Sequence, residues 1–119
     1  MHRDIKPENM VLDGDGYVRL TDLGIARLLA PNNADDTSGT PGYMAPEVMC
    51  RTDHGIAVDY YALGVTAYEF IFGQRPYPGK NRREIREAIF AKQVVIKKSE
   101  MPEGWSLEAA DFINKVSCI

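Results

Sequence analysis

The sequence is poor in cysteine and has no long apolar run. Its two cysteines, Cys50 and Cys118, lie far apart and lack the spacing of a metal site, so we expect reduced thiols in a cytosolic setting and no disulfide. No apolar run approaches the ~20 residues that a membrane-spanning helix requires, and no signal peptide opens the chain. These absences predict a protein without a membrane span, located in the cytoplasm or in both the cytoplasm and the nucleus.

An excess of positive charge is also missing. The formal net charge is −3 at pH 7, which gives no basic footprint for nucleic acid, and we expect no nucleic-acid partner. Arg82, Arg83 and Arg86 form a local cluster, and Lys97 and Lys98 form another. A solvated face explains each cluster better than a binding patch does. The 119 residues suffice for one small domain with a real core.

What the sequence does contain, near its start, is a set of side chains suited to moving a phosphoryl group. Asp4 can accept a hydroxyl proton and Lys6 can hold phosphate charge. Asn9 and Asp22 offer the hard oxygen ligands that magnesium prefers. A phosphoryl group in transfer needs an in-line nucleophile and cations against its oxygens, and little covalent help from the protein. These residue types therefore indicate phosphoryl transfer.

Three blocks resemble motifs of one family, in the family's order and spacing. The run HRDIKPEN at positions 2–9 resembles the protein-kinase catalytic loop, and DLG at 22–24 resembles the family's DFG metal motif. The run GTPGYMAPE at 39–47 resembles the end of the activation segment with its Ala-Pro-Glu block. A lone HRD tripeptide is a weak signal, but a coincidental polar loop does not explain three blocks. The third block also disfavours small-molecule phosphotransferases.

The chain is thus similar to eukaryotic-type Ser/Thr protein kinases of the AGC type. The resemblance covers essentially all 119 residues, but only the central part of the large C-lobe, from the catalytic loop to about helix H. It implies a mainly α fold of the α+β class, with one small β-hairpin and no N-lobe. Residues 1–119 would form one partial kinase domain with the activation segment and helices F, G and H. No Gly-rich phosphate loop, β3 Lys or helix-C Glu occurs in the sequence.

The first half of the chain is expected to contain one hairpin followed by a long loop. Short β-type runs at 10–12 and 17–21 flank an Asp-Gly-Asp-Gly turn, where glycine supplies positive φ. An EF-hand would need Gly and Glu where this segment has Val18 and Gly24, so we exclude a calcium loop. Residues 25–46 contain too much Pro, Asn and Asp to sustain a helix.

The second half is expected to be helical. A helix over Asp59–Phe72 carries apolar residues on nearly every face, which is typical of a buried helix, and Gly73 should help to end it. Asn81 is expected to cap a helix over 82–91, and Ser106 is expected to cap the last helix.

The resemblance implies the chemistry of the site. Asp4 would act as the base in the intact enzyme, and Lys6 would neutralise charge on the γ-phosphate of ATP. Asn9 and Asp22 would hold the metals, and Lys6, Asn9 and Asp22 together would bind the cofactors, ATP and Mg²⁺. Thr40 matches the family residue whose hydroxyl bonds the catalytic Asp and Lys.

The resemblance also implies protein substrates with Ser or Thr acceptors. In basophilic AGC kinases, acids at the positions of Glu8 and Glu69 grip an upstream Arg of the substrate, and both acids are present here. Pro41 and Met44 would shape an apolar pocket for the residue after the phosphoacceptor. Gly42 departs from the Glu that is frequent in this group, so a preference for further basic residues is not implied.

Regulation is expected in the activation segment. Many AGC kinases carry a phosphorylated Thr where this chain has Asp36. We expect the Asp36 carboxylate to replace phosphate in part as the partner of Arg3, with less charge and fewer acceptor oxygens. A merely solvated acidic loop is the open alternative. Thr37 and Ser38 are candidate phosphosites.

Three further residues are expected to support the site. Asp59 matches the family Asp that accepts backbone N–H bonds from the catalytic loop, a role compatible with that of a helix N-cap. Glu47 would pair with a buried Arg that this chain does not contain, which would leave a costly unpaired carboxylate. His2, within the catalytic-loop motif, is assigned to structural support.

These expectations lead to two hypotheses. The first is a piece of an ATP- and magnesium-dependent Ser/Thr protein kinase whose substrates carry upstream basic residues. Because the small lobe that covers ATP has no counterpart in the sequence, the chain alone should be inactive. The second is a non-catalytic kinase-like module or truncated gene product that acts by protein binding, if at all.

Overall fold

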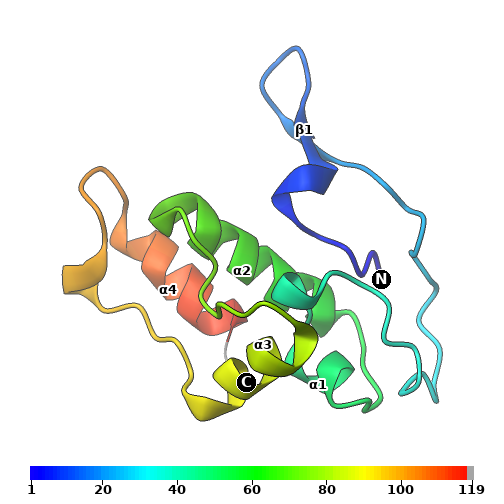
Figure 1. Cartoon of the computed structure of the whole chain (residues 1–119). Helices are drawn as coiled ribbons and strands as arrows, with labels where there is room; N and C mark the ends of the chain where they lie inside the picture. The colour runs from blue at the N-terminus through cyan, green and yellow to red at the C-terminus, as the bar shows by residue number, and fades with distance from the viewer. Residues whose placement is uncertain (118–119) are drawn as a thin grey trace.

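In the computed structural model, which describes residues 1–117, a β-hairpin projects from a helical body (Figure 1). Strands β1 (Met10–Leu12) and β2 (Val18–Leu20) are antiparallel, with Val11 opposite Arg19. The turn between them closes because the Asp13 carboxylate accepts backbone N–H bonds, including one of 2.9 Å from residue 17. The predicted hairpin is confirmed, although its second strand is one residue shorter at each end.

The remaining elements are helical, so the predicted mainly α fold with one small hairpin is confirmed for residues 1–117. Short 3₁₀ helices occur at one point before the hairpin and at two points after it. The elements are η1 (Pro7–Asn9), η2 (Pro41–Tyr43), α1 (Pro46–Met49), α2 (Ala57–Phe72), α3 (Arg82–Ala91), η3 (Lys98–Glu100) and α4 (Leu107–Val116).

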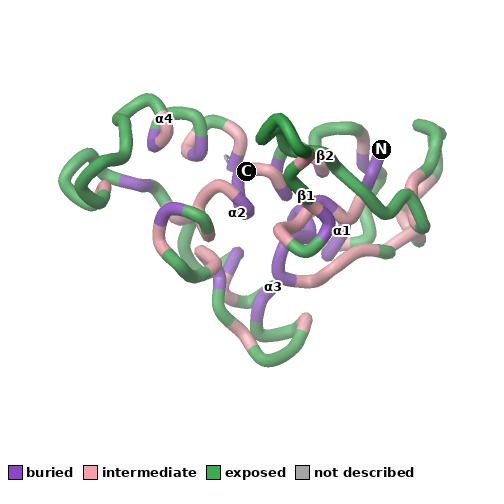
Figure 2. The backbone as a smooth tube through the Cα atoms, turned by 90° about the horizontal axis from the view of Figure 1, so that it is seen from above, coloured by how far each residue is buried: buried purple, intermediate pink, exposed green. Residues whose placement is uncertain are grey.

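Helix α2 lies at the centre of the body, between α4 on one side and η2, α1 and α3 on the other (Figure 1). Its apolar residues contribute to two clusters of buried side chains, and Figure 2 shows that buried positions concentrate in the helices while the hairpin is exposed. The larger cluster includes Ile5, Tyr43, Val48, Val58, Tyr61, Val65, Ile85 and Ile89, and the smaller one includes Ile71, Ile96, Ala110 and Ile113.

The prediction of a buried helix with apolar residues on nearly every face is wrong for one side of α2. Tyr60 is 55% exposed and Phe70 is 58% exposed, because within residues 1–117 no element covers the side from which they project. The helix also begins two residues earlier than predicted. It ends as predicted: Gly73 adopts a left-handed φ of 72° and donates its N–H to the carbonyl of Glu69 at 2.8 Å.

The two predicted helix caps are present. The Asn81 side chain accepts the N–H of Glu84 at 3.0 Å, and the Ser106 hydroxyl accepts the N–H of Ala109 at 3.3 Å. The bounds predicted for the helix over 82–91 are those of α3. Within the described part of the chain, no helix is both long enough and apolar enough to span a membrane.

Candidate active site

Asp4 lies in a hydrogen-bonded cluster built from two segments of the chain. The Thr40 hydroxyl donates to Asp4 Oδ1 at 2.6 Å across a separation of 36 residues. Lys6 Nζ lies 2.9 Å from Asp4 Oδ2 and donates to Thr40 Oγ1 at 2.8 Å. The Asn9 amide nitrogen donates to Asp4 Oδ2 at 3.0 Å. The fold therefore brings Asp4, Lys6, Asn9 and Thr40 together.

The surroundings of Asp4 favour its charged form. Burial alone would raise the pKa of this carboxyl. Hydrogen bonds from Thr40, Lys6 and Asn9, together with the positive charge of Lys6, outweigh burial and lower the pKa below its usual value. Asp4 is consequently ionised at neutral pH, which a proton acceptor requires.

The loop that carries Asp4 is anchored to the central helix. Asp59, in the first turn of α2, accepts the backbone N–H groups of His2 and Arg3, each at 2.7 Å. The His2 ring makes two further hydrogen bonds. Its Nε2 bonds the carbonyl of Thr21 at 3.0 Å, and its Nδ1 accepts the N–H of Asp4 at 3.3 Å. This anchoring holds Arg3 at a φ of 71°, which is uncommon for a residue with a side chain. Asp59 and His2 thus make contacts of the kind expected from residues that support the loop.

Asn9 and Asp22 flank the open end of the hairpin. Thr21, next to Asp22, donates its N–H to the carbonyl of Asn9 at 2.8 Å. The Asn9 side-chain oxygen accepts no hydrogen bond from residues 1–117, and Asp22 is exposed with one oxygen bonded to the N–H of Gly24 at 3.0 Å. No hydrogen bond joins Asp22 to Asp4 or Asn9 in this part of the chain.

These oxygens fit a magnesium ion, which prefers one or two protein oxygens and keeps waters or phosphate oxygens as its other ligands. Among residues 1–117 no group of three or more His, Cys, Asp or Glu side chains could hold a metal by itself. Asn9 and Asp22 are therefore the candidate ligands, through the side-chain amide oxygen and the carboxylate.

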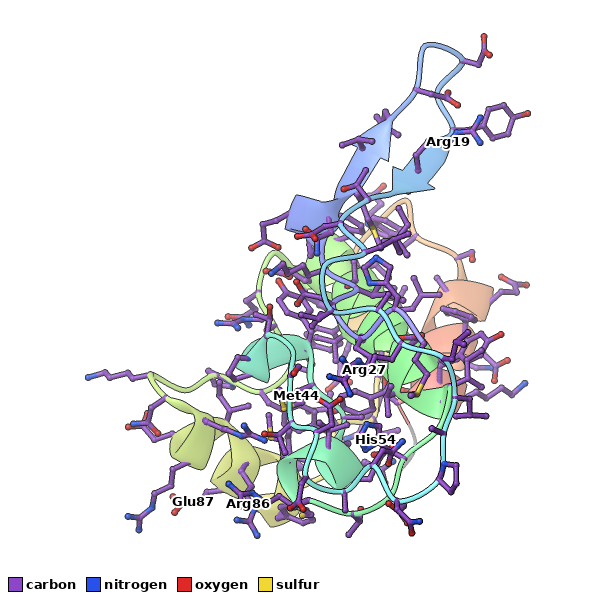
Figure 3. The ribbon with its side chains drawn as sticks, turned by 90° about the vertical axis from the view of Figure 1, so that its right-hand side faces the viewer. Arg19, Arg27, Met44, His54, Arg86 and Glu87 are labelled. Carbon is purple, nitrogen blue, oxygen red and sulfur yellow. The ribbon has the colours of Figure 1, made fainter. Side chains whose placement is uncertain are left out.

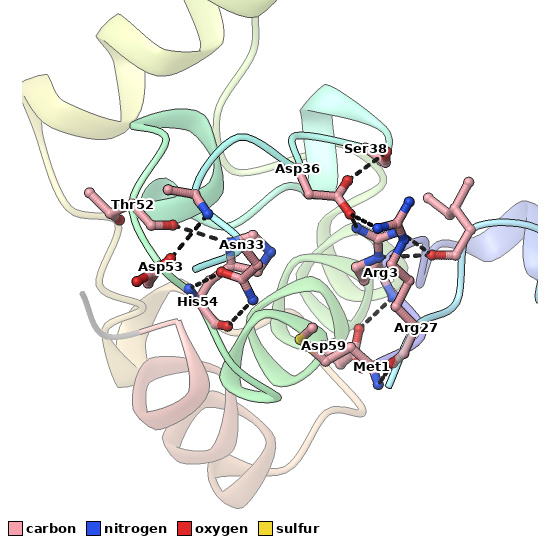
Figure 4. Close-up of polar contacts among 12 residues, drawn as sticks. Met1, Arg3, Arg27, Asn33, Asp36, Ser38, Thr52, Asp53, His54 and Asp59 are labelled. Carbon is pink, nitrogen blue, oxygen red and sulfur yellow. Dashed lines mark hydrogen bonds and ion pairs between the residues drawn. The ribbon is translucent and has the colours of Figure 1, made fainter. Parts of the chain in front are cut away.

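Arg3 makes a nearly buried ion pair with Asp36 (Figure 4). Arg3 Nη1 lies 2.6 Å from Asp36 Oδ2, and the two side chains are 5% and 17% exposed. The guanidinium also donates to the carbonyl of Ile25 at 2.8 Å from Nε. Burial would raise the pKa of Asp36, but hydrogen bonds from Arg3 and Ser38 and the charges of Arg3 and Arg27 lower it.

Glu8 and Glu69 both act on the phenol of Tyr43, a residue that sequence analysis did not single out. The Tyr43 hydroxyl donates to Glu69 Oε2 at 2.5 Å. Burial, this hydrogen bond and the negative charges of Glu69 and Glu8 raise the pKa of Tyr43, so both carboxylates act on the same phenol. The Arg75 guanidinium lies over the Tyr43 ring, 5.7 Å from its centroid.

Two arginines were also missed. Arg75 occupies the space above Gly42, where a Cβ would collide with its guanidinium. Arg27 lies 3.3 Å from Asp36 Oδ2 and is largely exposed. Arg75 lies outside the GTPGYMAPE block that contains Gly42, and Arg27 lies in a loop without a motif of its own, so no spacing signal identified either arginine. Tyr43 is different, since it lies inside the GTPGYMAPE block and its phenol is a polar group that needs a partner when buried.

The remaining predicted residues lie close to η2 and α1. Met44 is buried in the larger core cluster and Pro41, which opens η2, is half-buried. Glu47 is half-buried on α1 and forms no ion pair within residues 1–117. The substrate pocket predicted for Pro41 and Met44 stays a prediction.

The candidate phosphosites and cysteines differ in their surroundings. Thr37 is half-buried, whereas Ser38 is exposed and its hydroxyl donates to Asp36 Oδ1 at 2.9 Å. Cys50 is a free thiol, and Cys118 lies outside the described residues.

Comparison with known proteins supplies the family. The family described as "Protein kinase domain" matches residues 1–119. A cAMP-dependent protein kinase, catalytic subunit-like, from Caenorhabditis elegans is 37% identical over 116 residues, which are 98% of this chain and 28% of the relative. A rhodopsin kinase from Rattus norvegicus is 37% identical over 122 residues, covering 98% of this chain and 21% of the relative. A RAC-beta serine/threonine-protein kinase from Xenopus laevis is 38% identical over 111 residues, covering 92% and 23%.

The chain thus spans between about a fifth and three tenths of the length of these curated relatives. All three are protein kinases by name, and they include members of the AGC group.

Proposed function

The chain belongs to the protein kinase family, and from this premise we propose that the protein carrying it is a Ser/Thr kinase that phosphorylates other proteins. Protein kinases generally use ATP and Mg²⁺, which supply the transferable phosphoryl group and the cations that offset its charge. In this proposal Asp4 accepts the proton of the acceptor hydroxyl, a contribution of about 10²–10⁴ in rate. Lys6 neutralises phosphate charge, and Asn9 and Asp22 hold the metal.

One observation carries this proposal: the ionised Asp4 carboxylate is oriented by Thr40, Lys6 and Asn9. A carboxylate fixed by three donors keeps one defined geometry toward an incoming hydroxyl, which lowers the entropic cost of the reaction. The cluster also holds the Lys6 ammonium 2.9 Å from Asp4, so a positive charge lies beside the candidate base.

The test is phosphoryl transfer by the purified full-length protein. With labelled ATP and a generic basic protein substrate, the wild type should label Ser and Thr residues and Asp4→Asn should lose nearly all transfer. Asp15→Asn, in the exposed hairpin turn, is the matched control and should retain activity. Equal transfer by the Asp4 variant and the control would exclude the proposed base.

For substrate preference, we propose that the acidic site formed by Glu8, Glu69 and Tyr43 selects an upstream basic residue. Two carboxylates beside one phenol, with Arg75 as the cation over the ring, leave one negative charge in excess, which a substrate guanidinium satisfies through charge-assisted hydrogen bonds. A positional peptide array should show a basic preference that weakens in Glu69→Gln. An array without any basic preference would remove this part of the proposal.

For regulation, we propose that Asp36 stands in for a phosphorylated residue. The support is the ion pair with Arg3, which joins the segment containing Asp36 directly to the loop that carries Asp4. A constitutive carboxylate here would make the segment less dependent on phosphorylation. Thr37 and Ser38 remain candidate phosphosites. Unchanged activity of the full-length Asp36→Ala variant would contradict this role.

A non-catalytic, protein-binding module is the second candidate, and the exposed position of Asp22 favours it. A metal ligand without contact to the rest of the cluster gives a poorly organised cation site. We propose that the 119-residue chain by itself does not transfer phosphate. Robust ATP-dependent phosphorylation by this chain, abolished in Asp4→Asn, would overturn that proposal.

Two further expectations complete the proposal. The net charge of −3 supports the absence of a nucleic-acid partner, which a filter-binding assay with duplex DNA and single-stranded RNA would test. Cysteine usage supports a location in the cytoplasm, or in both the cytoplasm and the nucleus, which cell fractionation would test.

A further inference from the structure

Helices α1 and α3 form a groove of about 720 Å³ that contains none of the candidate active-site residues. Arg51, which follows α1, lines it together with three arginines of α3, and the apolar part consists of Met49 and Phe90. The groove lies at the end of the molecule opposite the hairpin, where Figure 3 shows Arg86 and Glu87 at the outer edge of α3. It therefore differs from the site around Asp4 in position and in composition.

The charge of the groove is opposite to that of the whole chain. Its residues include four arginines, Arg51, Arg82, Arg83 and Arg86, and one acid, Glu87, in a chain whose net charge is −3. Glu87 is already engaged, because its carboxylate lies 2.8 Å from Arg83 Nε. Among residues 1–117 no carboxylate pairs with the other three guanidinium groups. Three positive charges thus remain available to an anionic ligand.

Two features indicate that these arginines are arranged for binding. Arg51 holds a left-handed φ of 57° at the position after the C-cap of α1, where its N–H donates to the carbonyl of Val48 at 3.2 Å, the pattern of a Schellman motif. The motif therefore fixes the backbone from which the Arg51 side chain reaches the groove. Arg86 lies over the Phe90 ring at 6.0 Å, and Phe90 is 57% exposed. A cation and an apolar ring are therefore presented side by side.

We propose that this groove docks an acidic segment of a protein partner that carries an apolar side chain. Carboxylates of the segment pair with Arg51, Arg82 and Arg86 through charge-assisted hydrogen bonds, and its apolar side chain packs on Phe90 and Met49. The size of the groove suits a few side chains rather than an extended nucleic-acid strand. The four arginines give the groove a local positive charge that a short acidic peptide can match without contacting the negatively charged remainder of the chain. The inference does not depend on phosphoryl transfer.

The solvated-face interpretation of Arg82, Arg83 and Arg86 rested on their spacing alone. The fold adds Arg51 from 31 positions before Arg82, and it adds Met49 and Phe90 as an apolar floor. A solvated face needs neither feature, and both are what a peptide-docking groove requires.

The test is fluorescence anisotropy with the full chain and a labelled oligoglutamate peptide that has one central leucine. Arg51→Glu combined with Arg86→Glu should weaken binding by at least about tenfold, which corresponds to ~1.4 kcal/mol. Lys92→Glu combined with Lys98→Glu makes the same charge change at exposed cations outside the groove and should bind like the wild type. Equal loss in both double variants would overturn the proposal, because it would show a bulk charge effect.

Two probe controls separate the alternatives. The peptide with serine in place of leucine should bind several-fold more weakly, and the glutamine analogue should not bind. Raising the salt from about 0.1 M to about 1 M, which shortens the Debye length from about 10 Å to about 3 Å, should weaken binding of the acidic peptide. Full competition by single-stranded RNA, with no effect of the leucine, would show general polyanion binding and overturn the proposal. Dimerisation through the groove without peptide binding would also overturn it.

Arg51→Gly separates binding from folding. Glycine adopts the left-handed conformation without strain, so this variant should fold with an unchanged or higher Tm while its affinity for the peptide falls. A lower affinity with an intact fold supports the groove. Unchanged affinity removes Arg51 from the site and overturns the proposal.

Discussion

Asp4 and Asp22 carry the same functional group in opposite surroundings. The Asp4 side chain is 14% exposed and is held by Thr40, Lys6 and Asn9. Asp22 is exposed, adopts a left-handed φ of 62°, and within residues 1–117 its carboxylate accepts one hydrogen bond, from Gly24 two residues away. The first carboxylate is fixed by tertiary contacts, whereas the second is fixed by its own turn.

The difference shows how the two halves of the candidate site are organised. The loop around Asp4 is bonded to Asp59 on α2, the central helix, so contacts with the helical body fix the position of the candidate base. Asp22 follows an exposed hairpin strand, and although its neighbour Thr21 bonds the main chain of Asn9, the Asp22 carboxylate itself bonds only Gly24 among residues 1–117. We therefore expect substitutions at Asp4 and at Asp22 to differ in which property they change as well as in the size of the effect.

The largest expected effect is on turnover of the full-length protein, and its response to Mg²⁺ should distinguish the candidate base, Asp4, from the candidate metal ligand, Asp22. Asp4→Asn should lower kcat about 10²–10⁴-fold, and added Mg²⁺ should not restore it, because the lost group is a proton acceptor. Asp22→Asn should also lower turnover, but part of the loss should return as Mg²⁺ is raised, because a weakened ligand shifts metal affinity. Mg²⁺ titrations of initial rates measure both. An identical Mg²⁺ response in the two variants would remove the distinction.

The next effect concerns stability. Asp59→Asn keeps the shape of the side chain but loses its charge and one of two acceptor oxygens, and it should lower the free energy of unfolding by about 2 kcal/mol. Asp22→Asn, the matched change at an exposed turn, should stay within about 0.5 kcal/mol. Urea unfolding of the 119-residue chain measures both. Equal destabilisation would show that the exposed turn is as tightly coupled to the fold as the anchored loop.

A somewhat smaller effect is expected at the ion pair that links the two segments. Asp36→Ala leaves the nearly buried Arg3 without its carboxylate and should cost about 1–2 kcal/mol, less than a fully buried pair because Asp36 is partly exposed. Asp35→Ala, the exposed neighbour, should be near neutral. Thermal unfolding of both variants provides the comparison. If the two alanine variants unfolded alike, the solvated-loop interpretation of Asp36 would stand.

The smallest effect is a dependence on pH. Because the pKa of Asp4 is lower in the folded state, its contribution to stability is complete above the unfolded value of about 3.9. That contribution is lost as the pH falls through the folded pKa. Asp4→Asn should therefore flatten the acid limb of the stability curve below about pH 5. Unfolding free energies measured between neutral and acidic pH test this, and an unchanged slope would contradict it.

Much of the fold followed from local patterns. The hairpin turn, the caps at Asn81 and Ser106 and the stop at Gly73 depend on interactions within a few residues, and these predictions were confirmed. The exposed side of α2 was mispredicted, because composition reports that a helix is apolar but not which neighbours cover it.

For the candidate site too, some features were predictable from the sequence and others were not. Its residue types and order were recognisable in sequence, since the chemistry of phosphoryl transfer restricts which side chains can serve. The contacts of Tyr43 with Glu69 and Arg75, and of Arg27 with Asp36, could not be predicted. Helix α1 and most or all of α2 lie between Tyr43 and these two partners, and Arg27 and Asp36 belong to an irregular segment, so no local rule specifies which side chains meet.

By itself, the sequence determined the local elements and the set of groups available for chemistry, because turns, caps and side-chain types act over a few neighbouring residues. Only the tertiary structure decided that Asp4 is held by Thr40 while Asp22 remains exposed, and that Arg51 joins the arginines of α3. The reason is physical: the strength of a charge and the geometry of a hydrogen bond depend on burial and on partners. Burial and partners are properties of the packed chain as a whole.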